Sequence, residues 1–194
     1  MGLPVAALRL ADELGRLRPS APAPCVLPLT ADGRSWLLHA PRWWPLAPAE
    51  LDEMWEAHPD ERPVGIIMGR AVQFPRYTQA FGRDYTYTGQ VARARPFIDA
   101  PRTLQAVLEA LHSTPTLAGH NQALANWYAT EPGGKPDYMG PHSDDERELI
   151  PGAPIVSLSW CSAGHQRRER SCGTRTTIPA AAAGRLPNRA HEPH

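Results

Sequence analysis

Apolar side chains recur at helical spacing in three segments of the chain. The pattern is clearest in residues 101–112, where leucine and valine return as on the inner face of an amphipathic helix. Residues 48–57 begin with a proline and carry acidic residues in their first turn, both of which favour a helix N-terminus. Residues 4–17 show a weaker version of the same spacing. The sequence therefore predicts three helices in these segments.

Strand patterns are shorter and lie between the predicted helices. Residues 63–74 predict two strands joined by a turn at Gly69. Further strands are expected at residues 35–38, 85–88, 121–128 and 155–160. In the last of these, alternation places Val156, Leu158 and Trp160 on one face. Helices and strands thus follow one another without a repeat, which predicts an α+β fold.

The chain divides into three regions by composition. Residues 1–47 are rich in proline, and residues 19–28 within them are typical of a linker. Residues 48–160 hold most of the regular patterns and are expected to form the folded domain. In residues 161–194 no period of two or 3.6 survives, and Ile178 and Leu186 are the large aliphatic residues. The composition of this tail is typical of disorder.

So abrupt a loss of pattern has three explanations that the protein sequence leaves open. They are a shifted reading frame, an alternative splice end and a damaged gene. The tail is also strongly basic, with six arginines against Glu169 and Glu192, whereas the preceding residues carry a net charge of −4. The formal net charge of the whole chain is zero.

A basic and aromatic strip occupies residues 70–102. Its six arginines face only Asp84 and Asp99, and aromatic side chains are interleaved with them. Such a combination suits a phosphate backbone and unstacked bases. A strip of this kind on its own is more often a solvated face.

Three scattered cysteines form no disulfide framework or zinc pattern, which suits a reducing compartment. No apolar run is long enough to span a membrane, and residues 1–17 lack the apolar core of a secretory signal. We therefore expect an intracellular protein, cytoplasmic or nuclear, that acts as a monomer.

The chemistry that the sequence suggests centres on His142 and Asp144. Because side chains alternate along an extended segment, an imidazole and a carboxylate separated by one residue can point to the same side. They would supply two of the three ligands of a 2-His-1-carboxylate iron(II) site. A His-x-Asp triplet alone is weak evidence, and a solvated acidic turn is the commoner explanation.

The surrounding residues resemble the AlkB family of iron(II)- and 2-oxoglutarate-dependent dioxygenases. One similar segment runs from Asn126-x-Tyr128 through the His142-x-Asp144 triplet to Ser159. A second covers residues 74–89. The resemblance spans about residues 63–160. It implies a double-stranded β-helix, or jelly roll, with supporting helices and with its C-terminal strands missing from this chain.

The resemblance also implies roles for individual residues. His142 and Asp144 would bind the iron, and Asn126 and Tyr128 would bind 2-oxoglutarate. Four residues would bind the substrate. Tyr85 and Tyr87 would line the base pocket, Glu146 would read the edge of the flipped base, and Arg76 would belong to the recognition lid. Each of them has an ordinary structural explanation when taken alone.

Two functions follow as hypotheses. The first is oxidative dealkylation of bases in alkylated DNA or RNA, impaired here because the second histidine and the 2-oxoglutarate-binding arginine of the family are not found. His191 and His194 follow Asp144 at closer to the spacing expected of the second histidine, but no strand pattern surrounds them. The alternative is a non-catalytic remnant that binds nucleic acid.

Overall fold

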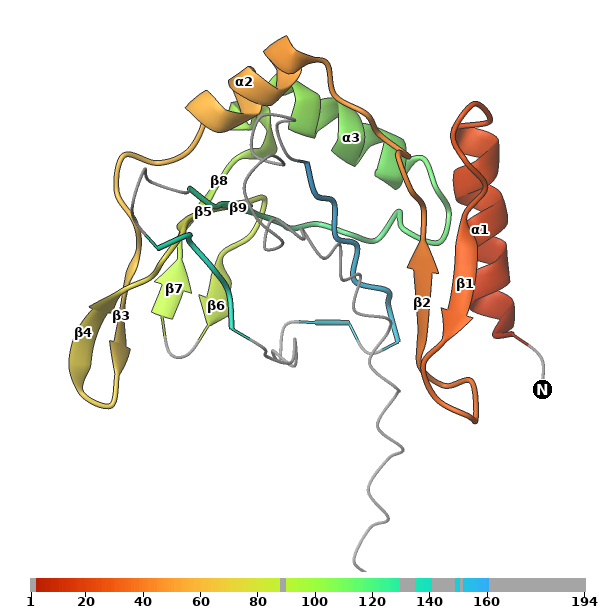
Figure 1. Ribbon diagram of the computed structural model, residues 1–194, viewed down its shortest axis with the longest axis horizontal. Helices are drawn as coiled ribbons and strands as arrows, with labels where there is room; N and C mark the ends of the chain where they lie inside the picture. Colours follow the sequence, from red (N-terminus) through yellow and green to blue (C-terminus); the bar gives the residue numbers. More distant parts are fainter. Residues whose placement is uncertain (1–2, 88–89, 130–134, 141–148, 151, 161–194) are drawn as a thin grey trace, which may run out of the picture.

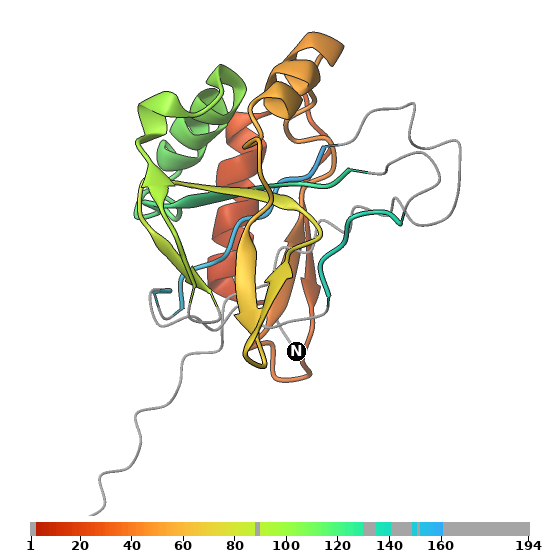
Figure 2. The ribbon, with the colours of Figure 1, turned by 90° about the vertical axis from the view of Figure 1, so that its left-hand side faces the viewer.

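The computed structural model describes residues 3–87, 90–129, 135–140, 149–150 and 152–160, with Tyr87 and Gln90 described for the backbone alone. Helices α2 and α3 lie above a small central sheet, and two hairpins project from the other side of it (Figures 1 and 2). A third helix, α1, packs beside a separate N-terminal hairpin. The expected α+β class is confirmed in this arrangement.

The N-terminal hairpin consists of β1 (Cys25–Pro28) and β2 (Trp36–His39), and α1 (Val5–Leu17) covers it. The two strands are antiparallel, with Cys25 opposite His39. The helix expected at residues 4–17 is thus confirmed. The linker expected at 19–28 is wrong over its last four residues, because pairing with β2 holds them in a strand that their own composition does not favour.

Helix α2 (Pro48–Glu56) and helix α3 (Arg102–His112) begin where the sequence predicts. Within α2, Glu50 reaches back to accept a hydrogen bond from the Ala47 N–H. Glu53 of α2 also caps α3, since its two carboxylate oxygens accept hydrogen bonds from the Arg102 backbone N–H and the Thr103 hydroxyl. A carboxylate at a helix N-terminus is favourable because it satisfies free N–H groups and opposes the helix dipole.

The central sheet has the strand order β8–β5–β9. Its strands are β5 (Tyr77–Phe81), β8 (Ala94–Arg95) and β9 (Ala123–Trp127). β5 pairs antiparallel with β9 and parallel with β8. The strand expected at 121–128 is confirmed as β9, but β5, the central strand, was not predicted from the sequence.

Two hairpins flank the central sheet. They are β3 (Val64–Ile67) with β4 (Arg70–Gln73), and β6 (Tyr85–Tyr87) with β7 (Gln90–Ala92). The first confirms the strand–turn–strand pattern of residues 63–74. Its turn residues Met68 and Gly69 both have positive φ, which is the backbone of a tight hairpin turn. A short 3-10 helix, η1 (Phe97–Asp99), precedes α3.

Residues 152–160 form an extended segment that is not a strand. Val156, Leu158 and Trp160 pack against the core that α1, β2 and α3 share, so the expected alternation is confirmed. The strand itself is a wrong prediction, because no strand among the described residues forms a hydrogen-bonded ladder with this segment. Trp160 Nε1 instead donates to the Trp44 carbonyl at 2.7 Å.

Two apolar clusters hold these elements together. One joins α1, β2 and α3, and the other lies between α2, α3 and one face of β5. Across the described residues the strands form one three-stranded and three two-stranded sheets, and none closes into a jelly roll. The jelly roll expected from the resemblance is therefore not seen in this part of the chain.

Candidate functional site

Polar side chains gather on one face of the β5–β9 ladder. Thr78 and Asn126 lie directly opposite each other, and the Thr78 hydroxyl donates to Asn126 Oδ1 at 3.0 Å. Arg76, just before β5, donates from Nε to the same oxygen at 3.0 Å. Because the carbonyl oxygen of the amide accepts both bonds, the amide orientation follows from the network. Neither bond uses the two hydrogens of Asn126 Nδ2.

Tyr128 adds a phenol to this polar face. It follows Asn126 by two residues, one position past the end of β9, and continued alternation there puts the two side chains on the same side. Burial raises the pKa of the Tyr128 hydroxyl above its usual range; the Arg76 guanidinium opposes that rise and Asp137 adds to it. The phenol is therefore a neutral donor at physiological pH. A guanidinium, an amide and a phenol near one another form a donor set suited to a carboxylate ligand.

The other face of the same ladder is packed against α2. Trp127 is buried, and its indole N–H donates to the carbonyl of Met54. Tyr77, its partner across the ladder, stacks on His58 with ring centroids 4.4 Å apart. These contacts fix the ladder to the helical layer, and so fix the position of the polar face behind it.

An ion pair that the sequence did not predict closes the end of β9. Arg62 Nη2 and Asp137 Oδ2 lie 3.0 Å apart, and the Asp137 side chain is only 5% exposed. The same oxygen accepts the Ala129 N–H at 3.0 Å, and the Asp137 N–H donates to the Ala129 carbonyl at 2.9 Å. Since 75 positions separate the two charged residues, no local pattern could have indicated the pair.

The structure brings together only part of the predicted site. The guanidinium of Arg76, which was expected in a recognition lid, contacts Asn126, the predicted 2-oxoglutarate residue. Tyr85 lies half-buried on β6. The Tyr87 side chain and three further predicted site residues lie outside the described residues; these three are His142, Asp144 and Glu146.

No metal centre is built from the residues that the structure describes. Among them no group of three or more histidine, cysteine or acidic side chains could hold a metal ion. Asn126 and Tyr128 fit a 2-oxoglutarate ligand, whereas the predicted iron ligands His142 and Asp144 are outside the described residues. The described helices are also all too short or too polar to cross a membrane.

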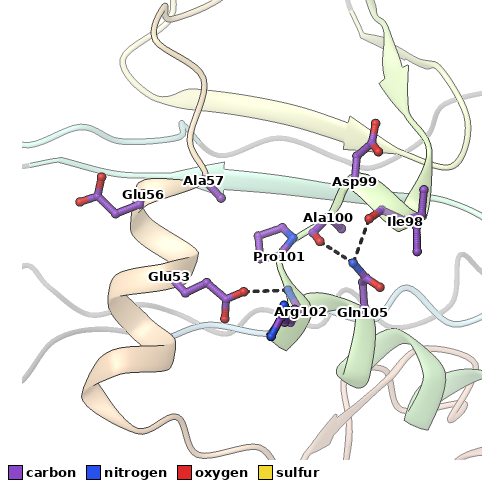
Figure 3. Close-up of a pocket in the computed structure, with 9 residues that line it drawn as sticks. All are labelled: Glu53, Glu56, Ala57, Ile98, Asp99, Ala100, Pro101, Arg102 and Gln105. Atoms are coloured by element: carbon purple, nitrogen blue, oxygen red, sulfur yellow. Dashed lines mark hydrogen bonds between the residues drawn. The ribbon is translucent and has the colours of Figure 1, made fainter.

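An open pocket of about 440 Å³ lies between α2 and the start of α3 (Figure 3). Of its acidic lining residues, Glu53 caps α3 and Asp99 lies 3.8 Å from Arg95. Gln105 Nε2 donates to the Ala100 carbonyl at 2.7 Å and to the Ile98 carbonyl at 3.1 Å. These polar groups hold η1 and α3 in place, and none of the predicted site residues that the structure describes lines the pocket.

Comparison with known proteins identifies the class to which this fold and site belong. Residues 44–177 match the model of the 2OG-Fe(II) oxygenase superfamily, and the chain belongs to that superfamily. It is 32% identical over 98 residues to the mouse protein "DNA oxidative demethylase ALKBH2", covering 48% of this chain and 37% of the relative. The human protein of the same name is 33% identical over 100 residues, covering 48% and 34%.

These matches confirm the AlkB-like character that the motifs predicted. The chain spans only a little over a third of the length of each curated relative. The superfamily membership suggests a dioxygenase that uses iron(II) and 2-oxoglutarate.

Proposed function

We propose that this protein is an AlkB-like dioxygenase that oxidatively dealkylates bases of nucleic acid. The observation that carries the proposal is the polar face of the β5–β9 ladder, where Arg76 and Thr78 orient Asn126 beside Tyr128. Asn126 Nδ2 and the Tyr128 hydroxyl donate hydrogen bonds to 2-oxoglutarate. When bound, iron(II) and 2-oxoglutarate would together activate O2 for the hydroxylation of an alkyl group on the base.

The remaining roles follow from the motif. His142 and Asp144 bind the iron, and Glu146 reads the edge of the base. Tyr85 and Tyr87 line the pocket, because a target base has to leave the stack to reach the reacting centre and an aromatic ring then holds it. We take residues 48–160 as the dioxygenase domain, with residues 1–47 as an N-terminal extension and 161–194 as a tail. We assign the central sheet and its supporting helices to one part of the double-stranded β-helix that the family implies.

The substrate class rests on charge and on similarity. Of the basic strip, Arg70 and Arg83 are exposed, and Arg93 and Arg95 are mostly exposed although they pair with Asp84 and Asp99. Exposed guanidinium groups beside aromatic residues suit a nucleic-acid backbone. The names of the mouse and human relatives favour DNA over RNA.

Two binding measurements test the proposal. The first is an anaerobic titration with 2-oxoglutarate in the presence of cobalt(II), an iron(II) surrogate, comparing the wild type with Asn126→Ala. We expect saturable binding that the substitution weakens, since it removes an orienting donor. The second is fluorescence anisotropy with alkylated single-stranded DNA at two salt concentrations, where affinity should fall as salt rises. A wild type that binds neither ligand refutes the proposal.

A second function is favoured by the composition of the tail. It is a non-catalytic form that binds nucleic acid, because residues 161–194 carry none of the strand patterns expected around a third iron ligand and its neighbouring arginine. Salt-sensitive DNA binding without any binding of metal and 2-oxoglutarate would identify this non-catalytic form.

A further inference from the structure

Asp137 holds both backbone polar groups of the residue that follows Tyr128. Its carboxylate accepts the Ala129 N–H at 3.0 Å, and its own N–H donates to the Ala129 carbonyl at 2.9 Å. These two bonds tie Asp137 to Ala129 from both directions. With its N–H and carbonyl both engaged, Ala129 has little freedom to rotate, and the exit of the chain from β9 is fixed at Tyr128.

The carboxylate that does this is buried beside a site proposed for an anion. The Asp137 side chain is 5% exposed, and its charge is close enough to influence Tyr128. A buried charge without a partner is strongly unfavourable, and it would also repel the carboxylates of 2-oxoglutarate. Asp137 therefore needs a cation that neutralises it.

Arg62 is that cation, and the structure holds it from two sides. Its Nη2 contacts Asp137 Oδ2 at 3.0 Å, and its Cζ lies 4.9 Å from the centre of the Tyr77 ring. Tyr77 is in turn stacked on His58. Stacking on an aromatic ring favours a guanidinium and orients its plane, which leaves one edge directed at the carboxylate.

We propose that Asp137 and Arg62 are positioning residues for the anion-binding face. Asp137 sets the direction of Tyr128 through Ala129, and Arg62 cancels the charge that this arrangement would otherwise place near a bound carboxylate. The inference rests on the proposed function, because it takes 2-oxoglutarate as the ligand of Tyr128.

A single variant and a double variant test the charge role of Arg62. Arg62→Gln leaves the carboxylate buried and unneutralised, so the affinity for 2-oxoglutarate should fall on the order of 10-fold or more, as when a group supporting a ligand-binding residue is lost. Arg62→Gln/Asp137→Asn removes both charges while the new amide oxygen still accepts the Ala129 N–H. We expect this double variant to recover most of the affinity.

Arg62→Gln/Asp137→Ala tests the other half of the inference. It is equally free of charge but has no acceptor for the Ala129 N–H, so it should not recover affinity. The Ala129 amide should exchange with solvent faster in this variant and at the wild-type rate in the Asn-containing one. Affinity is measured by anaerobic titration with cobalt(II) present, and exchange by amide NMR without any ligand.

Two further variants serve as controls. Asp84→Ala removes a carboxylate with the same kinds of partner, the Ala94 N–H and an arginine, but one whose side chain is 41% exposed. It should speed exchange at Ala94 and leave Ala129 and the 2-oxoglutarate affinity unchanged. Val107→Ala lowers stability through the core of α3 and should also leave the affinity unchanged, which separates positioning from general destabilisation.

The outcomes separate this inference from the proposed function. If the wild type binds and the two double variants have equal affinity and equal Ala129 exchange, the positioning role is wrong and the function stands. If the wild type binds no 2-oxoglutarate, the proposed function fails and the anion role of Arg62 fails with it. The exchange rates then decide only whether the Asp137 carboxylate holds the Ala129 N–H: faster exchange only in the Ala-containing variant supports this contact, and equal rates overturn it.

Discussion

The two faces of the β5–β9 ladder are built from the same strands but differ in what fixes them. On one face, Phe81 and Trp127 are buried against the helices, and burial of apolar surface supplies the stabilisation. On the other, Thr78 and Asn126 meet through directed hydrogen bonds that also involve Arg76. The stability of the first face depends on the volume of its buried side chains. The arrangement of the second face depends on the direction of its hydrogen bonds.

This difference assigns stability and ligand binding to separate sides of one sheet. A polar network contributes little net free energy, because each bond replaces a bond to water. It contributes orientation instead, which a binding site requires. Changes to the apolar face should therefore unfold the protein, and changes to the polar face should alter binding at a small cost in stability.

The largest effect is expected from Phe81→Ala on the apolar face. Phe81 is 1% exposed, and truncating a buried phenylalanine leaves a cavity that typically costs about 3–5 kcal/mol. Urea unfolding followed by tryptophan fluorescence measures the loss. Met68→Ala is the control, because Met68 is 99% exposed and its truncation should change stability by less than about 0.5 kcal/mol. Equal effects of the two variants would contradict the assignment of the core to this face.

A smaller loss is expected from Gly82→Ala, at the end of β5. Gly82 has a φ of +86°, and a Cβ there would overlap the Phe97 ring and lie 2.5 Å from the Asn121 carbonyl oxygen. Backbone strain in this region costs about 1–3 kcal/mol, to which the overlap adds. Gly119→Ala is the matched control, since it meets nothing within 4 Å and has no positive φ. If thermal unfolding shifts equally in both variants, the close packing at the end of β5 is not what requires glycine.

The sequence predicted the elements whose signal is local. Helix α3 has a clear periodicity, helix α2 has a recognisable first turn, and the hairpin of residues 63–74 has a turn glycine. β5 was missed because Tyr77–Phe81 mixes polar and apolar residues on both faces: Gln79 shares a face with Phe81, and Ala80 is fully buried on the other. Its pairing with β9, more than 40 residues away, is what makes it a strand.

The candidate site likewise contains residues predicted from a local motif and contacts that no local pattern predicted. Asn126 and Tyr128 were predicted from a motif, and the structure places them on one polar face. The hydrogen bond from Arg76 to Asn126 was not predicted because it spans 50 positions, and the Arg62–Asp137 pair spans 75. Contacts of that range depend on how β5 and β9 come together. A sequence pattern can indicate the residues that do chemistry, but not those that hold them in place.

A double-mutant cycle on Thr78 and Asn126 measures the polar face directly. Thr78→Val keeps the shape of the side chain but removes the hydroxyl that donates to Asn126 Oδ1. We expect it to cost about 0.5–1.5 kcal/mol in the free energy of unfolding, the net value of one hydrogen bond. In an Asn126→Ala background the same change should cost almost nothing, because the acceptor is gone. Additive effects of the two substitutions would show that the bond does not contribute.

The smallest effect concerns the alkaline limit of stability and tests the burial of Tyr128. The ordinary pKa of a tyrosine is 10.0, and burial raises the pKa of Tyr128 in the folded protein above that value. The folded state then holds its proton more tightly than the unfolded state. The stability linked to this group is fully present below about pH 10 and is lost as pH rises through the folded pKa.

Tyr128→Phe should therefore lose less stability than the wild type when the pH is raised from 9 to 11, as measured by urea unfolding at each pH. The difference is expected to be small, because Tyr128 is 42% exposed and solvent weakens the effect. Arg76→Gln sharpens the test, since Arg76 is the cation that holds this pKa down and its removal should widen the gap from Tyr128→Phe. A gap that narrows instead would mean that Arg76 does not act on the phenol, and the polar face would then lack the cation that makes it suited to an anion.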